Sequence, residues 1–170
     1  MPRAPGTLQP RRTPVRWWAV PIASTVAGSL LTLWPAVASA PALPSIGLLM
    51  ALGWRFLRPE LWPAWMALPL GAADDLISGA PLGSAMALWT LAFLTVDLAE
   101  HRPMWRDHWL HWALAALCVA GVGVGQWALA AFTAGGGGLL PLLPQLLLGA
   151  LLFPVAARVC AALDRWRLRG

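Results

Sequence analysis

The sequence predicts an all-α integral membrane protein: a bundle of six transmembrane helices with both termini in the cytoplasm. Of its 170 residues, 59% are hydrophobic and only 11% are charged, and the mean hydropathy is +0.65. A soluble domain of this size needs far more charge to cover its surface. The apolar residues also fall into runs long enough for membrane spans, with arginines at the ends of those runs.

The chain begins with a basic arm, residues 1–16, and a predicted first span over residues 17–39. This span has about the twenty residues that a bilayer requires. Ala38-Ser39-Ala40 resembles a signal-peptidase site, so a cleaved signal peptide is the alternative interpretation. The apolar run is longer than the roughly 7–15 residues of a signal-peptide h-region, and further apolar runs follow at once, which favours a retained span.

Five more spans complete one predicted transmembrane domain over residues 17–163, and a basic cytoplasmic tail follows at 164–170. The spans are residues 45–57, 61–78, 82–96, 109–132 and 139–163. The breaks between them hold turn-forming or polar residues: Pro41 and Pro44, residues 58–63, Gly79-Ala80-Pro81, the loop 97–108, and the four glycines 135–138.

The distribution of arginine sets the predicted orientation. The chain has no lysine, and its twelve basic residues fall in the segments that six spans place on one side: 1–16, 55–60, 97–108 and the end of the chain from Arg158. The segments on the other side contain none. Because arginine-rich loops remain in the cytoplasm, both termini are expected there. Most tryptophans near span ends agree, with Trp17, Trp18, Trp54, Trp62, Trp105, Trp109 and Trp166 on the inner side and Trp34 and Trp127 nearer the outer side.

Composition and motifs exclude several function classes. The net charge of +5 does not indicate nucleic-acid binding, because no basic patch is interleaved with aromatic residues on a polar segment. Cys118 and Cys160 lie in apolar segments and are expected to be small buried side chains. The sequence contains no phosphate loop, nucleophile elbow or HExxH motif. We therefore expect no catalytic residues, no cofactor and no enzyme activity.

The predicted functional residues lie between Gly71 and Gly83. Gly71, Asp75, Gly79 and Gly83 recur every four residues, a spacing that keeps side chains on one helical face. We call these four residues the seam. A carboxylate in a stripe of glycines indicates helix packing or partner binding rather than a lipid-facing surface. Because neighbouring residues point about 100° apart, Asp75 is expected to face the bundle and Asp74 to face headgroups or water.

Simpler interpretations stay open for several residues. Asp74 and Asp75 are also placed to cap a helix end. A metal site is not predicted at His101, His108 and His111, since no further ligand stands at a fixed spacing. Glu60 and Glu100 each have an arginine within two positions, which predicts solvated ion pairs. Gly121 and Gly125 form a small-xxx-small pair, typical of close helix packing.

The stretch 58–83 resembles the MreD family of bacterial rod-shape-determining membrane proteins. The resemblance lies in Arg58-Pro59-x-x-x-Pro63, followed by Gly71-x-x-x-Asp75-Leu76-x-x-Gly79-x-x-Leu82-Gly83. The basic arm, the number of spans and the basic tail are similar too. Asp74 departs from the family pattern, as does the excess of tryptophan and glycine, so no role of Asp74 is implied by the resemblance.

The resemblance implies a non-enzymatic component of the cell-elongation machinery in the bacterial inner membrane. Its implied partners are MreC and, with it, the MreB filament system and the peptidoglycan synthases. Anionic lipid is expected at the cytoplasmic arginines. The family is similar in fold to the substrate-binding subunits of energy-coupling-factor transporters. The alternative function is therefore a small-molecule, vitamin-type binding subunit of a transporter, with Asp75 as the polar anchor of an outward-facing pocket.

Overall fold

The computed structural model describes residues 16–33, 44–100, 108–135, 140 and 142–168. Within them the chain forms six α-helices and no β-strand: α1 (Arg16–Leu30), α3 (Ile46–Leu57), α4 (Ala67–Ser78), α5 (Ser84–Glu100), α6 (His108–Ala134) and α7 (Leu142–Leu168). This confirms the all-α prediction. The interpretations placed on residues 1–15, the turn at Pro41, the loop from His101 to Asp107 and the glycines 136–138 lie outside the described residues.

The predicted span 61–78 is wrong in its first part. Two 3₁₀ turns, η2 (Pro59–Leu61) and η3 (Ala64–Met66), precede α4, which begins only at Ala67. Pro63 disfavours helical backbone at the residue before it, and Trp62 has φ −125° and ψ 68°. Pro69 has no N–H to donate to the carbonyl of Trp65, so a regular α-helix is not favoured there either. The α-helices α3 and α4 have 12 residues each, about 18 Å at 1.5 Å per residue.

Within the described residues, two helices are long and apolar enough to cross a membrane, by length and composition. They are residues Trp109–Thr133 of α6 and Leu142–Leu168 of α7. The other apolar helices are shorter: Trp17–Leu33, which includes the 3₁₀ turn η1 (Leu31–Leu33), and Ile46–Leu57. The helices thus follow the order of the predicted spans, but among the described residues only α6 and α7 combine the length and the hydropathy of a complete span.

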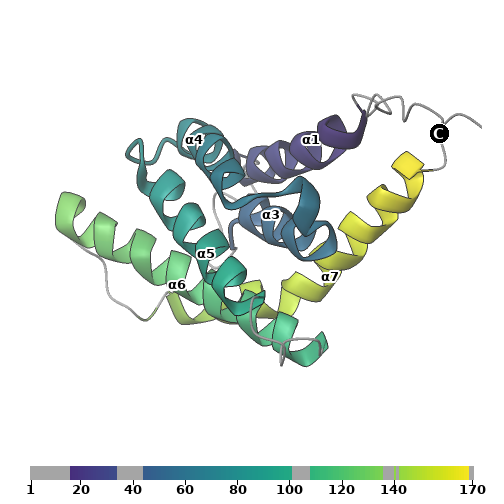
Figure 1. Cartoon of the computed structure of the whole chain (residues 1–170). Helices are drawn as coiled ribbons and strands as arrows, with labels where there is room; N and C mark the ends of the chain where they lie inside the picture. The colour runs from purple at the N-terminus through teal and green to yellow at the C-terminus, as the bar shows by residue number, and fades with distance from the viewer. Residues whose placement is uncertain (1–15, 34–43, 101–107, 136–139, 141, 169–170) are drawn as a thin grey trace, which may run out of the picture.

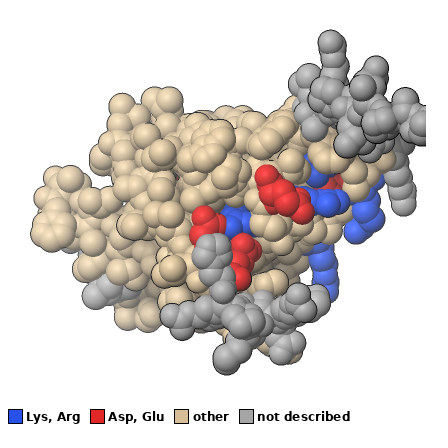
Figure 2. All heavy atoms as spheres, viewed as in Figure 1, with Lys and Arg blue, Asp and Glu red and all other residues tan. Residues whose placement is uncertain are grey.

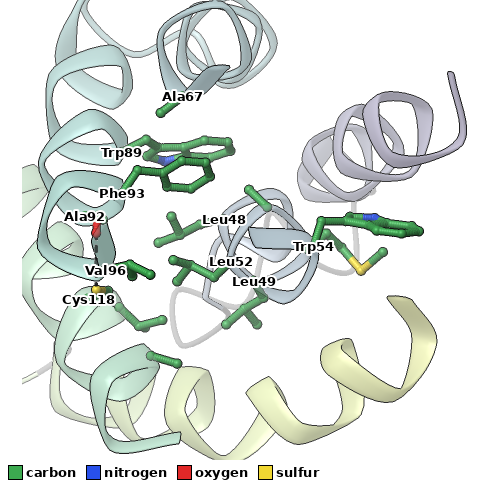
Figure 3. Packing of buried hydrophobic residues seen from close by; sticks show 14 of the residues in the cluster. Leu48, Leu49, Leu52, Trp54, Ala67, Trp89, Ala92, Phe93, Val96 and Cys118 are labelled. Carbon is green, nitrogen blue, oxygen red and sulfur yellow. Dashed lines mark hydrogen bonds between the residues drawn. The ribbon is translucent and has the colours of Figure 1, made fainter. Parts of the chain in front are cut away.

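The short helix α3 lies at the centre of the bundle, between α1, α5, α6 and α7 (Figure 1). Nine of its twelve residues are buried. Leu48 and Leu52 lie on the side of Phe93 and Val96 of α5, whereas Trp54 extends on the other side, towards α1 and α7 (Figure 3). A helix this short is held by packing on all sides rather than by its own propensity. Trp54 and Trp62 are therefore core residues, although we expected them at a membrane boundary.

Two prolines inside helices leave backbone carbonyls without their usual donors, and neighbouring helices supply replacements. Proline has no N–H, so the carbonyl four residues earlier loses its intrahelical bond. Pro21 in α1 frees the carbonyl of Trp17, which accepts from Arg167 Nη1 of α7 at 2.6 Å. Pro154 in α7 frees the carbonyl of Ala150, which accepts from Trp112 Nε1 of α6 at 2.9 Å. Each proline therefore becomes a contact between helices.

Replacing Trp112 by Phe tests this pairing. The ring is kept but the donor to Ala150 is lost, so we expect the free energy of unfolding to fall by about 1 kcal/mol. Thermal unfolding of the purified chain in detergent measures the change. Trp65→Phe is the matched control, because Trp65 is an exposed tryptophan.

A double-mutant cycle gives the sharper comparison. In a Pro154→Ala background residue 154 regains an N–H, and Trp112→Phe should then cost clearly less. An equal cost in both backgrounds would contradict the proposed replacement of the missing donor.

Candidate functional site at the junction of α4 and α5

Asp75 joins the end of α4 to the start of α5. Its Oδ1 accepts from the backbone N–H of Ala85 at 2.8 Å and from Ser84 Oγ at 2.7 Å, and its Oδ2 accepts from the N–H of Gly83 at 2.8 Å. The first N–H groups of a helix have no intrahelical acceptor, and a carboxylate there also matches the helix dipole. Asp75 is only 1% exposed. It therefore acts as an N-terminal cap for α5, supplied by the preceding helix.

Gly71 lets the backbones of α4 and α5 touch. A Cβ at this position would lie 2.7 Å from both the N and Cα atoms of Met86, and 2.8 Å from the carbonyl carbon of Ala85. These are backbone atoms, so they cannot move aside as a flexible side chain can. Gly71 and Asp75 together are the part of the seam that faces α5.

Gly79 and Gly83 do not share a helical face with Gly71 and Asp75. The helix ends at Ser78, and Gly79 takes the left-handed conformation at its end, with φ +70°. Gly83 also has a positive φ, +100°, and a Cβ on either glycine would meet nothing within 4 Å. These two glycines are needed for the shape of the turn. The expectation that all four seam residues share one helical face is therefore wrong for Gly79 and Gly83, whereas the predicted turn at Gly79 is present.

The expectation that Asp74 faces headgroups or water is wrong. Its side chain is turned into the bundle, is 5% exposed, and accepts from Ser29 Oγ of α1 at 2.5 Å. Gly47 of α3 makes room for this pair, since a Cβ there would lie 3.2 Å from Asp74 Oδ1. Two adjacent carboxylates thus bind two different neighbours, Asp74 binding α1 and Asp75 binding α5.

The remaining motif positions divide into turn residues and exposed residues. Pro59 opens η2, and Pro63 directly precedes η3. Leu76 and Leu82, on either side of the turn, are 71% and 72% exposed. The junction therefore presents an apolar surface that the described part of the chain does not bury.

A network of charged residues at the other end of the bundle was not predicted from the sequence. Arg55, Asp164 and Arg167 of this network are buried. Arg55 of α3 is 4% exposed and pairs with Asp97 and with Glu100 of α5, the latter at 2.9 Å. Arg102, the near neighbour expected to pair with Glu100, lies outside the described residues. The partner that the structure shows for Glu100 is 45 positions away. Figure 2 shows the visible charges gathered over one part of the surface, while the part over the α4–α5 turn and the end of α6 is uncharged.

The second half of this network centres on α7. Asp164 accepts from Arg58 Nη2 at 2.9 Å and pairs with Arg167 Nη2 at 2.6 Å. The guanidinium of Arg167 also lies 5.4 Å from the ring centroids of Trp17 and Trp54. Arg167 also donates to the carbonyl of Trp17, which Pro21 leaves free. A proline inside an apolar run indicates such a free carbonyl in the sequence, but the sequence does not indicate which side chain donates to it.

Three grooves on the described part of the bundle are apolar. They have volumes of about 390 Å³ between α1, α3 and α7, about 330 Å³ between α3, α6 and α7, and about 300 Å³ between α5 and α6. No Asp, Glu or Arg lines any of the three. Within the described ranges, no three His, Cys, Asp or Glu residues are grouped as metal ligands. Cys118 and Cys160 are buried and free, as expected.

Comparison with known proteins identifies no relative: no family model, no curated protein and no solved structure matches this chain. The resemblance of residues 58–83 to the MreD family therefore remains a prediction.

Gly71→Ala is expected to destabilise the fold by about 1–3 kcal/mol, because the new methyl group meets the backbone of α5. Gly121→Ala is the matched control. Gly121 is also inside a helix, and a Cβ there meets nothing within 4 Å, so its higher helix propensity should make the change neutral or stabilising. Chemical unfolding in detergent measures both. Equal stability of the two variants would refute the close contact.

Asp75→Asn should also lower the free energy of unfolding, by about 1–3 kcal/mol, since the amide nitrogen cannot accept from a backbone N–H of α5. Ser78→Ala is the control on the same turn, because its one bond, from the N–H of Ala80, is exposed and 3.4 Å long. If the asparagine variant unfolds at the wild-type midpoint while Ser78→Ala does too, Asp75 is not a cap that matters for stability.

Proposed function

We propose that this chain is a multi-pass scaffold of the bacterial inner membrane that serves the cell-elongation machinery, as MreD does. In this proposal it has no enzyme activity, both termini lie in the cytoplasm, and the junction of α4 and α5 binds MreC and, through it, the peptidoglycan synthases. The fold is proposed to be similar to that of energy-coupling-factor binding subunits.

The distribution of exposed apolar residues supports the membrane placement. In the most apolar stretches of α6 and α7, only 33% and 22% of residues are buried, whereas a core helix of a soluble protein is mostly buried. Exposed leucines also occur on α1, α4 and α5. Trp65, Trp109 and Trp166 are exposed near the arginine-rich end, as is usual for tryptophans at a membrane interface. The short helices α3 and α4 would then be shielded by their neighbours.

The single observation that carries the scaffold role is a contrast within residues 71–83: Asp75 and Gly71 are fully used in contacts with α5, whereas Leu76 and Leu82 are exposed. Both carboxylate oxygens of Asp75 are engaged by α5, and Gly71 is covered by it. Asp75 is therefore not available as a polar anchor for a small ligand. Leu76 and Leu82 remain exposed on either side of this rigid turn. An apolar surface on a preorganised support suits a protein partner better than a diffusible substrate.

The transporter alternative has weaker support. Its pocket would need a few converging polar groups, and the three grooves have almost none on their walls. Thermal unfolding with and without a panel of vitamins distinguishes the two functions. A saturable rise in the unfolding midpoint would favour the transporter subunit.

Replacing Leu76 and Leu82 together by Gln should weaken co-purification with MreC about tenfold or more, because hot-spot side chains each contribute over 1 kcal/mol. Both side chains are exposed, so the fold should persist. Leu98→Gln is the control, an equally exposed leucine (70%) near the opposite end of α5. The measurement is tagged co-purification from membranes, with cell shape as a second readout. Undiminished binding and normal rods would argue against this surface.

A further inference from the structure

An apolar groove lies between α3, α6 and α7 on the arginine-rich side of the bundle. Its volume is about 330 Å³, and it is lined by Gly53, Phe56, Leu57, His111, Trp112, Phe153, Pro154 and Ala157. Its walls therefore come from the last turns of α3, the first turns of α6 and the middle of α7. No carboxylate lies on its walls, so nothing there would repel an anion.

Arg158 is next in sequence to a residue that lines this groove. It follows Ala157 in sequence and is four residues after Pro154, so it shares a helical face with that proline. A side chain on a helix covers the surface of the preceding turn, which here is the edge of the groove at Pro154. Arg158 is exposed.

The described arginines differ in whether they form ion pairs with carboxylates. Arg55, Arg58 and Arg167 all form ion pairs with carboxylates. No ion pair within the described residues involves Arg158 or Arg165. Arg158 lies seven residues before Arg165, about 10 Å further from the end of the helix. In a membrane, an arginine at that depth is costly unless it reaches a counter-ion.

We propose that this groove binds an anionic phospholipid of the inner leaflet. One acyl chain fills the apolar groove, and the phosphate pairs with the guanidinium of Arg158. The proposal rests on the membrane placement given above and names a specific lipid partner for it. The larger groove between α1, α3 and α7 has a single polar lining residue, Ser24, and is a less suitable site for a charged headgroup.

Native mass spectrometry of the full chain in detergent tests the site. Phosphatidylglycerol is titrated against phosphatidylcholine with the same acyl chains. Arg158→Gln should lower the apparent affinity for phosphatidylglycerol about fivefold, the factor expected for one arginine at a membrane surface. Arg165→Gln removes the same charge from the same helix and should change it much less. Ala157→Leu fills the groove and should lower binding even though the arginine is kept.

Several results would overturn the site. They are equal effects of Arg158→Gln and Arg165→Gln, equal binding of the two lipids, or displacement of the lipid by excess inorganic phosphate. The last would show that Arg158 binds a free anion. Alkaline carbonate extraction of wild-type membranes distinguishes failure of the membrane placement from failure of the lipid site alone. A chain that carbonate releases would overturn the membrane placement and the lipid site together, whereas a retained chain with equal lipid binding by both arginine variants would overturn the site alone.

Discussion

The structure depends on one constraint: backbone groups that lose their partner inside a helix must find one on another helix. The start of α5 receives the carboxylate of Asp75 from α4. The carbonyls of Trp17 and Ala150, left free by Pro21 and Pro154, receive donors from α7 and α6. In hydrocarbon each unpaired group costs several kcal/mol. If the bundle lies in a membrane, as we propose, these pairings decide which helices must be neighbours.

The polar interactions divide the bundle into two different ends. At one end, partly buried ion pairs connect Arg55 of α3 to α5, and Arg58, the residue after α3, to α7. At the other, two adjacent carboxylates bind α1 and α5 through hydroxyl and amide groups. Between them lies α3, held by apolar packing (Figure 3). Buried pairs of this kind stabilise little compared with apolar replacements, but breaking one leaves an uncompensated charge. Their main effect here is to fix which helices meet and in what register.

Hydrophobic runs and arginine positions were enough to predict an all-α chain with helices in this order, because span length and charge are local properties of the sequence. Helix ends were less predictable, since two 3₁₀ turns precede α4, which begins only at Ala67. The inward position of Asp75 followed from its spacing to Gly71, but the same spacing misled at Gly79 and Gly83, where the backbone leaves the helix. Hydrogen-bond partners far apart in the sequence could not be predicted. Trp112 and Ala150 are 38 positions apart, and Arg167 and Trp17 are 150 apart, so only the assembled bundle reveals them.

The central position of α3 has a consequence for biogenesis. In the proposed membrane setting, α3 leaves the ribosome early. Arg55 within it and Arg58 directly after it have their carboxylate partners on α5 and α7. With only 12 residues, α3 cannot dwell alone in the lipid beside the insertion channel. Its final placement must therefore wait until the last helix has been translated. A chain that stops short of α7 would remain a trapped insertion intermediate, open to quality-control proteases, even though most of its core sequence is already made.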